Sequence, residues 1–400
     1  MSGAAPIIDG STIQGPTVKS PTIKGWCPGA LRPMESGDGW VVRVRPRAGR
    51  LSQDQARGIA ALSAAHSNGL IDLSARANVQ LRGVTMASHA PLIDGLRALG
   101  LLDESTQAES QRNVTLAPFW ARGDGAHDVA LDLSAALTSP SAPRLPSKFG
   151  FVVDMGVAPI LRNIAADIRI ERISGGALIY GQGAQTGAMV PLAQAVQTAL
   201  HLAQWFVDAG GIGADGRGRM AGLLAQGRAA PAAFAQCAVP AALPFAPHIG
   251  LHKAGALVGF EFGQMQAETL AKLAGLGPLR ITPWRMVLIE GAQTMPTLAH
   301  VITDADDQML RVIACTGAPA CIQAHGPTRD LARALAPHIP QGQVCHVSGC
   351  AKGCAHPTAA ALTLTATPSG FDLVQNGRAG DTPTLAGLAP SYIPQALNAL

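Results

Sequence analysis

Long hydrophobic runs are missing from this 400-residue sequence, in which no window of about twenty residues is both apolar and free of charge. A membrane-spanning helix needs such a run, so we expect no membrane partner. Residues 1–20 also lack the basic start and apolar stretch of a secretory signal, and they contain Asp9. We therefore interpret them as a flexible leader and expect a cytoplasmic protein.

Charged and aromatic residues are both scarce. Charged residues form 14% of the chain and aromatic residues 4%, whereas 48% of the residues are hydrophobic, which is enough to build packed cores and excludes a disordered chain. Lysine is rarer still, because the 30 basic residues comprise 24 arginines and 6 lysines. This surplus reflects either a G+C-rich genome or a need for bidentate partners of carboxylate or phosphate groups. No basic cluster or fold signature indicates a nucleic-acid partner.

The chain has only seven cysteines, and five of them fall close together near its C-terminal end. Cys315 and Cys321 are spaced C-x5-C, and Cys350 and Cys354 are spaced C-x3-C. A disulfide framework is disfavoured without a secretory signal, and five intervening residues suit zinc knuckles poorly. Four thiolates from two loops suit a [4Fe-4S] cluster, in which each iron needs one sulfur. The alternative is that these are buried cysteines of an apolar core.

A strand–helix–strand pattern occurs twice in the chain. Residues 40–45, 53–68 and 78–83 form the first copy, and residues 256–262, 267–274 and 286–291 form the second. A Pro- and Ala-rich stretch over 230–247 separates the two copies. The pattern predicts a duplicated α+β unit.

The segments around the four cysteines, A-C-T-G-x-P-x-C and H-V-S-G-C-x-x-G-C-A-x-P, resemble those of the sulfite and nitrite reductase superfamily. Further similar segments are 74–83, 111–114, 145–149 and 217–219. The resemblance implies an α+β, pseudo-two-fold architecture with ferredoxin-like half-domains. The implied order is a leader (1–20), a first half-domain (21–100), a first reductase-like domain without cluster cysteines (101–235), a second half-domain (245–300) and a second reductase-like domain with the cluster cysteines (301–400).

The resemblance also implies roles for basic residues around a tetrapyrrole and its carboxylates. Arg76, Arg112 and Lys148 are the candidate catalytic cations, against the alternative that each is a solvated surface charge. The candidate substrate-binding residues are Arg32, Asn78, Gln80, Arg82, Arg217 and Arg219. Gly150 stands where sulfite reductases carry a second lysine, which weakens the case for reduction of a bound oxyanion.

Residues 25–34, together with Gly37-Asp38-Gly39, resemble the opening of one branch of the superfamily, the precorrin-3B synthases. This resemblance implies an O2- and NADH-dependent monooxygenase that hydroxylates precorrin-3A at C20 and closes a lactone from the ring A acetate, before ring contraction in cobalamin biosynthesis. The implied cofactors are a [4Fe-4S] cluster on Cys315, Cys321, Cys350 and Cys354 and a non-haem iron, with electrons from a separate donor protein.

Other possibilities remain open on the sequence. No ligand set for a mononuclear iron can be singled out, because its residues need only be near in space. Cys27 is a possible extra ligand, and Cys345 fits a small buried filler. One alternative function is a sirohaem-dependent sulfite or nitrite reductase in which Cys354 would bridge cluster and haem. A third is a non-catalytic iron–sulfur sensor or electron carrier.

Overall fold

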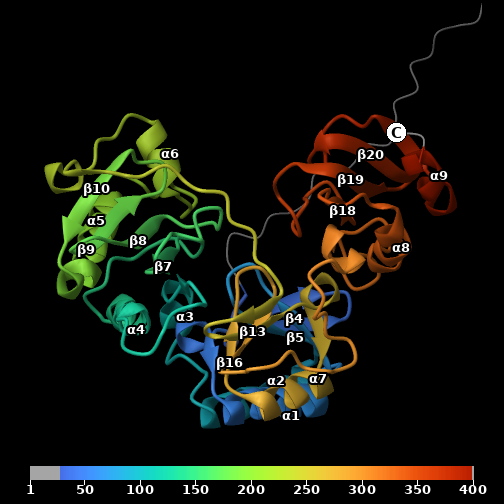
Figure 1. The fold of residues 1–400 in the computed structure, drawn as a ribbon, viewed down its shortest axis with the longest axis horizontal. Helices are drawn as coiled ribbons and strands as arrows, with labels where there is room; N and C mark the ends of the chain where they lie inside the picture. The colour runs from blue at the N-terminus through green and yellow to red at the C-terminus, as the bar shows by residue number, and fades with distance from the viewer. Residues whose placement is uncertain (1–27, 399–400) are drawn as a thin grey trace, which may run out of the picture.

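The computed structural model describes residues 28–398, so the leader at 1–20 and Cys27 lie outside the described residues. Figure 1 shows three parts: a base at the bottom and two lobes that rise from it on opposite sides. The base contains elements β1 to α2 and β12 to β16, the first lobe β6 to β11, and the second lobe β17 to α9. No helix in the described part of the chain is long and apolar enough to cross a membrane.

The base is built from two five-stranded sheets that exchange strands. The first sheet has the order β1 (Met34–Ser36), β2 (Gly39–Val44), β5 (Val79–Val84), β4 (Leu70–Leu73) and β14 (Gln264–Gln266). The second has the order β12 (Gly250–His252), β13 (Gly255–Val258), β16 (Val287–Glu290), β15 (Leu279–Ile281) and β3 (Arg50–Leu51). Each half of the chain therefore supplies the edge strand of the other half's sheet, which the linear order of the sequence pattern did not predict.

Two matching turns produce this exchange. The sequence pattern predicted a strand over 256–262, but β13 ends at Val258, and the turn at Glu261–Gly263 has Phe262 at a φ of 56°. The turn at Arg47–Gly49 has Ala48 at a φ of 48° in the same place. A left-handed residue reverses the chain direction sharply, so each turn sends the chain across to the neighbouring sheet.

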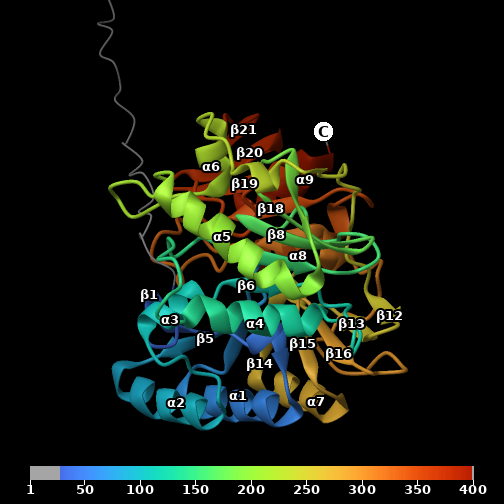
Figure 2. The ribbon, with the colours of Figure 1, turned by 90° about the vertical axis from the view of Figure 1, so that its left-hand side faces the viewer.

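Helices cover the outer face of the base. They are α1 (Gln53–His66), α2 (Met86–Ala98) and α7 (Ala267–Leu276), and Figure 2 shows them as one layer below the sheets. The capping box of Ser52 and Gln55 starts α1 by satisfying free backbone N–H groups of its first turn. Ile59 of α1 and Leu270 of α7 belong to the one core that the two halves share. The halves consequently bury their apolar faces together.

The two lobes repeat one topology. The first has the sheet order β11 (Cys237–Ala238), β10 (Thr186–Val190), β9 (Gly176–Gly181), β8 (Ile168–Ile173), β7 (Phe151–Asp154) and β6 (Val114–Leu116). The second has the order β17 (Val312–Ala314), β18 (Cys345–Ser348), β19 (Ala360–Thr367), β20 (Gly370–Gly377) and β21 (Leu385–Leu388). In each lobe three parallel strands lead into antiparallel ones, which confirms the predicted duplication.

The remaining helices pack on these lobe sheets or join them to the base. They are α3 (Thr106–Gln111), α4 (Ala126–Thr138), α5 (Ala195–Asp208), α6 (Met220–Ala225), α8 (Arg329–Leu335) and α9 (Ile393–Asn398). Because the lobes share a topology, the loops after β6 and β7 occupy the same places as the loops after β17 and β18. Only the second pair carries the clustered cysteines.

Candidate functional site

The four candidate ligands lie on two loops at one edge of the second lobe. Cys315 and Cys321 follow β17, and Cys350 and Cys354 follow β18. β17 and β18 are adjacent and parallel, so their carboxyl ends meet at the same edge of the sheet. Residues about forty positions apart in sequence are thereby brought to one place.

Backbone and thiol groups converge on Cys315. Its Sγ accepts a hydrogen bond from the N–H of Gly349 at 3.1 Å. A hydrogen bond from Cys354 is the main cause that lowers the pKa of Cys315 to about 6, with further help from the N–H groups of Gly349 and Gly317. Gly349 is required here because a Cβ would lie 2.7 Å from Ala324 Cβ and 3.4 Å from the Cys315 sulfur. The arrangement favours a thiolate at Cys315.

The donor set fits an iron–sulfur cluster better than a single metal ion. Within residues 28–398, no three His, Cys, Asp or Glu side chains are close enough to hold one ion. A cluster spreads its irons over several ångströms and takes one thiolate at each, so its ligands stand farther apart than those of one ion. The charges of Cys315 and Cys321 both act on Cys350, which indicates that the sulfurs are neighbours. Cys345 differs, because complete burial raises its pKa to about 12 and suits a packing role.

The loop between Cys315 and Cys321 is anchored on the base through one carbonyl group. The oxygen of Ala320 accepts hydrogen bonds from Ser36 Oγ at 2.5 Å, from the N–H of Gly37 at 3.0 Å and from Arg82 Nη2 at 3.4 Å. A Cβ at Gly37 would lie 2.1 Å from the carbonyl oxygen of Pro319. This close approach explains why the Gly37-Asp38-Gly39 motif begins with glycine. The sequence alone did not predict where the motif lies in the fold.

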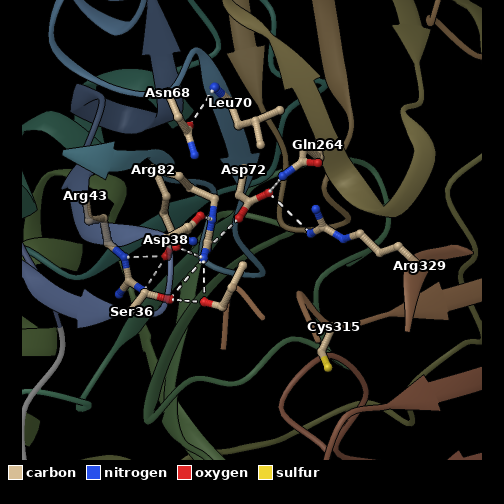
Figure 3. Close-up of polar contacts among 12 residues, drawn as sticks. Ser36, Asp38, Arg43, Asn68, Leu70, Asp72, Arg82, Gln264, Cys315 and Arg329 are labelled. Atoms are coloured by element: carbon tan, nitrogen blue, oxygen red, sulfur yellow. Dashed lines mark hydrogen bonds and ion pairs between the residues drawn. The ribbon is translucent and has the colours of Figure 1, made fainter. Parts of the chain in front are cut away.

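A chain of ion pairs supports this anchor, as Figure 3 shows. Arg82 pairs with Asp38 at 2.8 Å and with Asp72 at 3.0 Å, and its side chain is only 6% exposed. Asp72 also accepts a hydrogen bond from Gln264 at 2.7 Å and pairs with Arg329 of α8 at 3.4 Å. The network therefore joins both halves of the base to the second lobe. We name it the junction network.

The opposite side of the base carries a matching network with its charges exchanged. By strand register, Arg280 and Glu290 occupy the places of Asp72 and Arg82, and they pair at 3.4 Å. Arg50 pairs with Glu290 at 2.7 Å. Arg280 Nη1 donates to the carbonyl oxygens of Pro118 and Trp120, in the loop after β6, at 2.7 Å each. Equivalent charge networks of the base thus anchor the equivalent loop of each lobe.

Asp154 occupies the end of β7, where the second lobe begins its C-x3-C loop. Its Oδ2 accepts hydrogen bonds from the N–H groups of Ile160 and Leu161 at 2.6 and 2.7 Å. Burial raises the pKa of Asp154 to about 6 despite these bonds. Asp154 therefore ionises less readily in the folded protein than in the unfolded chain. The free energy of unfolding consequently falls by roughly 3 kcal/mol as the pH rises from about 4 to about 6.

We therefore expect Asp154→Asn to gain stability relative to the natural protein as pH rises. The free energy of unfolding, measured by urea titration, should shift in favour of the variant by about 3 kcal/mol between about pH 4 and pH 8. Asp132→Asn, at an exposed position of α4, is the control and should show no such trend. A difference between Asp154→Asn and the natural protein that stayed constant with pH would contradict this account.

Two of the three predicted catalytic cations lie together. Arg76 follows β4, and its Nη2 donates to the backbone carbonyl oxygen of Lys148 at 3.0 Å. Lys148 is exposed and Arg76 is partly exposed. The structure thus brings the loop after β4 against residues 145–149 at the boundary of base and first lobe, where both cations reach the surface.

Arg112 and Arg82 are placed differently from the expectation. The Nε and Nη2 atoms of Arg112 donate to the two oxygens of Asp103 at 2.9 and 2.8 Å, and Nη2 also donates to the carbonyl oxygen of Arg45. Both side chains are buried, with exposed fractions of 4% for Arg112 and 5% for Asp103. Arg82 pairs with Asp38 and Asp72 in the junction network. Both guanidinium groups thus have carboxylate partners within the protein, which hold them in place.

The other predicted substrate-binding residues are scattered. Gln80 accepts two hydrogen bonds from Arg43, and Asn78 is 7% exposed. Arg219 pairs with Asp167 at 2.8 Å, and exposed Arg217 lies 3.7 Å from Asp215. Arg32 is exposed and lines a cavity of about 220 Å³ that Ser147 also borders, next to Lys148. Of this set, Arg32 lines a cavity with the neighbour of Lys148, and Asn78 lies in the same loop as Arg76.

Comparisons with known proteins agree with the geometry. Residues 32–99 match the family model of the nitrite/sulfite reductase ferredoxin-like half domain. A protein from Sinorhizobium sp. named precorrin-3B synthase is 29% identical over an alignment of 401 positions, which spans 90% of this chain and 84% of that protein.

A solved structure shows the same fold. The Mycobacterium tuberculosis NirA protein superposes with a TM-score of 0.66 at 16% identity, covering 90% of this chain and 80% of that one. The superposition shows that the two chains share one fold over most of their lengths. Residues 32–99 thus match the ferredoxin-like half domain of nitrite and sulfite reductases, and most of the chain is similar to a precorrin-3B synthase.

Proposed function

We propose that this chain is a precorrin-3B synthase. In the proposed reaction one atom of O2 enters precorrin-3A as the C20 hydroxyl group, and the ring A acetate closes a lactone. The other oxygen atom leaves as water, with two electrons from NADH and two protons completing the balance. This reaction prepares the macrocycle for ring contraction in aerobic cobalamin biosynthesis.

The similarity to the Sinorhizobium precorrin-3B synthase over 90% of this chain is the observation that carries the proposal. The substrate's chemistry agrees with the side chains at the boundary of base and first lobe. Precorrins carry acetate and propionate groups, and Arg76 and Lys148 are adjacent cations there. Arginine and lysine bind such carboxylates through charge-assisted hydrogen bonds.

Within the proposal, Cys315, Cys321, Cys350 and Cys354 hold a [4Fe-4S] cluster, which supplies single electrons when bound. The backbone N–H of Gly349 and the anchored Ala320 fix the first cysteine loop. Arg76, Lys148 and Arg32 bind the substrate carboxylates and orient the macrocycle. We also propose a non-haem iron for the site, and a separate protein that passes electrons from NADH to this chain.

Arg76→Ala tests the carboxylate role. A lost charge-assisted hydrogen bond is worth about 1.5–3 kcal/mol, so tetrapyrrole affinity should fall roughly 10- to 100-fold with iron content unchanged. Fluorescence or absorbance titration with precorrin-3A measures this. Arg57→Ala, on the outer helix α1 and paired with Asp54, is the matched control and should bind normally. Unchanged affinity in Arg76→Ala would refute the role.

The alternative is a sirohaem-dependent sulfite or nitrite reductase. Gly150 is buried, and its N–H donates to Asp167 at 2.9 Å, so this position supplies no second cation beside Lys148. An absorption spectrum of anaerobically purified protein separates the two functions. A broad iron–sulfur shoulder without a Soret band supports the synthase, whereas strong Soret and chlorin-type bands from sirohaem would establish the reductase instead.

A further inference from the structure

Arg285 occupies a conformation that most residues avoid. It lies in the loop between β15 and β16 with a φ of 62°, in the left-handed region. Such a conformation is unfavourable for a residue with a Cβ. The matching loop of the first half has Ala77 at a φ of 53° in the equivalent place. The second half thus has a long cation where the first has a methyl group.

The side chain of Arg285 reaches out of the base to the second cysteine loop. Its Nη2 donates to the carbonyl oxygen of Ala355, the residue directly after Cys354, at 3.0 Å. The hydroxyl of Thr282 holds the turn by bonding the N–H and carbonyl groups of Met286. The Arg285 side chain is therefore held at its base by the left-handed backbone and at its guanidinium by the second cysteine loop.

Arg285 lies close enough to the cysteine loops to interact with them electrostatically. Burial lowers the pKa of Arg285, and electrostatic interactions with Cys354, Asp72 and Cys315 oppose this effect. Asp72 is already paired with Arg82 and Arg329 in the junction network. A partly buried cation needs a compensating negative charge, and the cysteine loops supply one.

We propose that Arg285 is a positioning residue that raises the reduction potential of the iron–sulfur cluster held by the four cysteines. A thiolate-ligated cluster becomes more negative on reduction, and net charge and nearby groups set its potential. A fixed positive charge at the second cysteine loop stabilises the reduced form more than the oxidised form. The inference depends on the ligand set in the proposed function and is independent of the substrate.

The test is a redox titration of the full-length, anaerobically loaded protein without substrate, followed by electron paramagnetic resonance. Arg285→Gln should keep its iron and sulfide but titrate at a more negative midpoint potential, whereas Arg285→Lys should stay near the natural value. Arg333→Gln is the control, since Arg333 is half-exposed and pairs with Glu261 and Asp330. A loaded Arg285→Gln protein with an unchanged midpoint would overturn the proposal.

If Arg285→Gln loses its cluster, the cluster content of Arg285→Lys becomes the test. Restored loading in the lysine variant supports a requirement for charge, and continued loss contradicts it. The same measurements separate this inference from the proposed function. Natural protein that binds no cluster would refute the ligand assignment, whereas a cluster-loaded protein that does not convert precorrin-3A would refute only the synthase.

Discussion

Replacing Cys350 by serine should abolish both the iron–sulfur cluster and turnover. Serine keeps the shape of the side chain but offers a hydroxyl in place of the thiolate that iron prefers. Cys350 lies on the loop after β18, and the charges of Cys315 and Cys321 act on it. We expect the purified variant to lose the iron–sulfur absorbance, bound iron and sulfide, and all measurable turnover.

Two other cysteines serve as controls for this variant. Cys237 lies in the first lobe, on β11, so Cys237→Ser should retain iron and turnover. Cys345 is fully buried beside the site but does not belong to the ligand set, so Cys345→Ala should lose some stability and keep its cluster. If Cys350→Ser kept four irons and full turnover, the ligand assignment would be wrong.

Arg82→Met should destabilise the protein by about 3 kcal/mol, because partly buried Asp38 loses its paired cation and buried Asp72 keeps only the longer pair with Arg329. The free energy of unfolding from urea titration measures the effect. The variant also removes one of the hydrogen bonds to Ala320, so the first cysteine loop loses part of its anchor. We therefore expect slower cluster assembly from iron and sulfide in the folded variant.

Arg57→Met is the matched control, since Arg57 pairs with Asp54 on the solvent side of α1 with its side chain 50% exposed. It should change stability by less than about 1 kcal/mol. Natural stability in Arg82→Met would show that the junction network is not a buried charge network. Natural stability would also return Arg82 to the candidate substrate-binding residues.

The duplication and the cluster cysteines could be predicted from the sequence because both leave local patterns. Strand and helix periods recur in each half, and the C-x5-C and C-x3-C spacings stand apart from ordinary cysteine use. The exchange of edge strands leaves no such trace. It depends on left-handed conformations at Ala48 and Phe262, residue types that give no sign of a turn.

The roles of individual arginines could not be predicted for a related reason. Sequence shows that Arg82 and Arg112 are cations but not which carboxylates face them. Asp72 and Asp103 become their partners only when strands and loops assemble. The same limit concealed Arg285, whose only sign in the sequence is an arginine in a short loop. The Gly37-Asp38-Gly39 motif was the one available signal for the junction, through its two glycines.

Conversion of precorrin-3A tests the central claim most directly. The loaded protein would be incubated with precorrin-3A, an electron donor and isotopically heavy O2, and the product analysed by mass spectrometry. We expect a product heavier than the substrate by one labelled oxygen atom, formed by the natural protein and not by Cys350→Ser. A substrate that stays unchanged with the loaded natural protein, while sulfite or nitrite is reduced, would contradict the central claim.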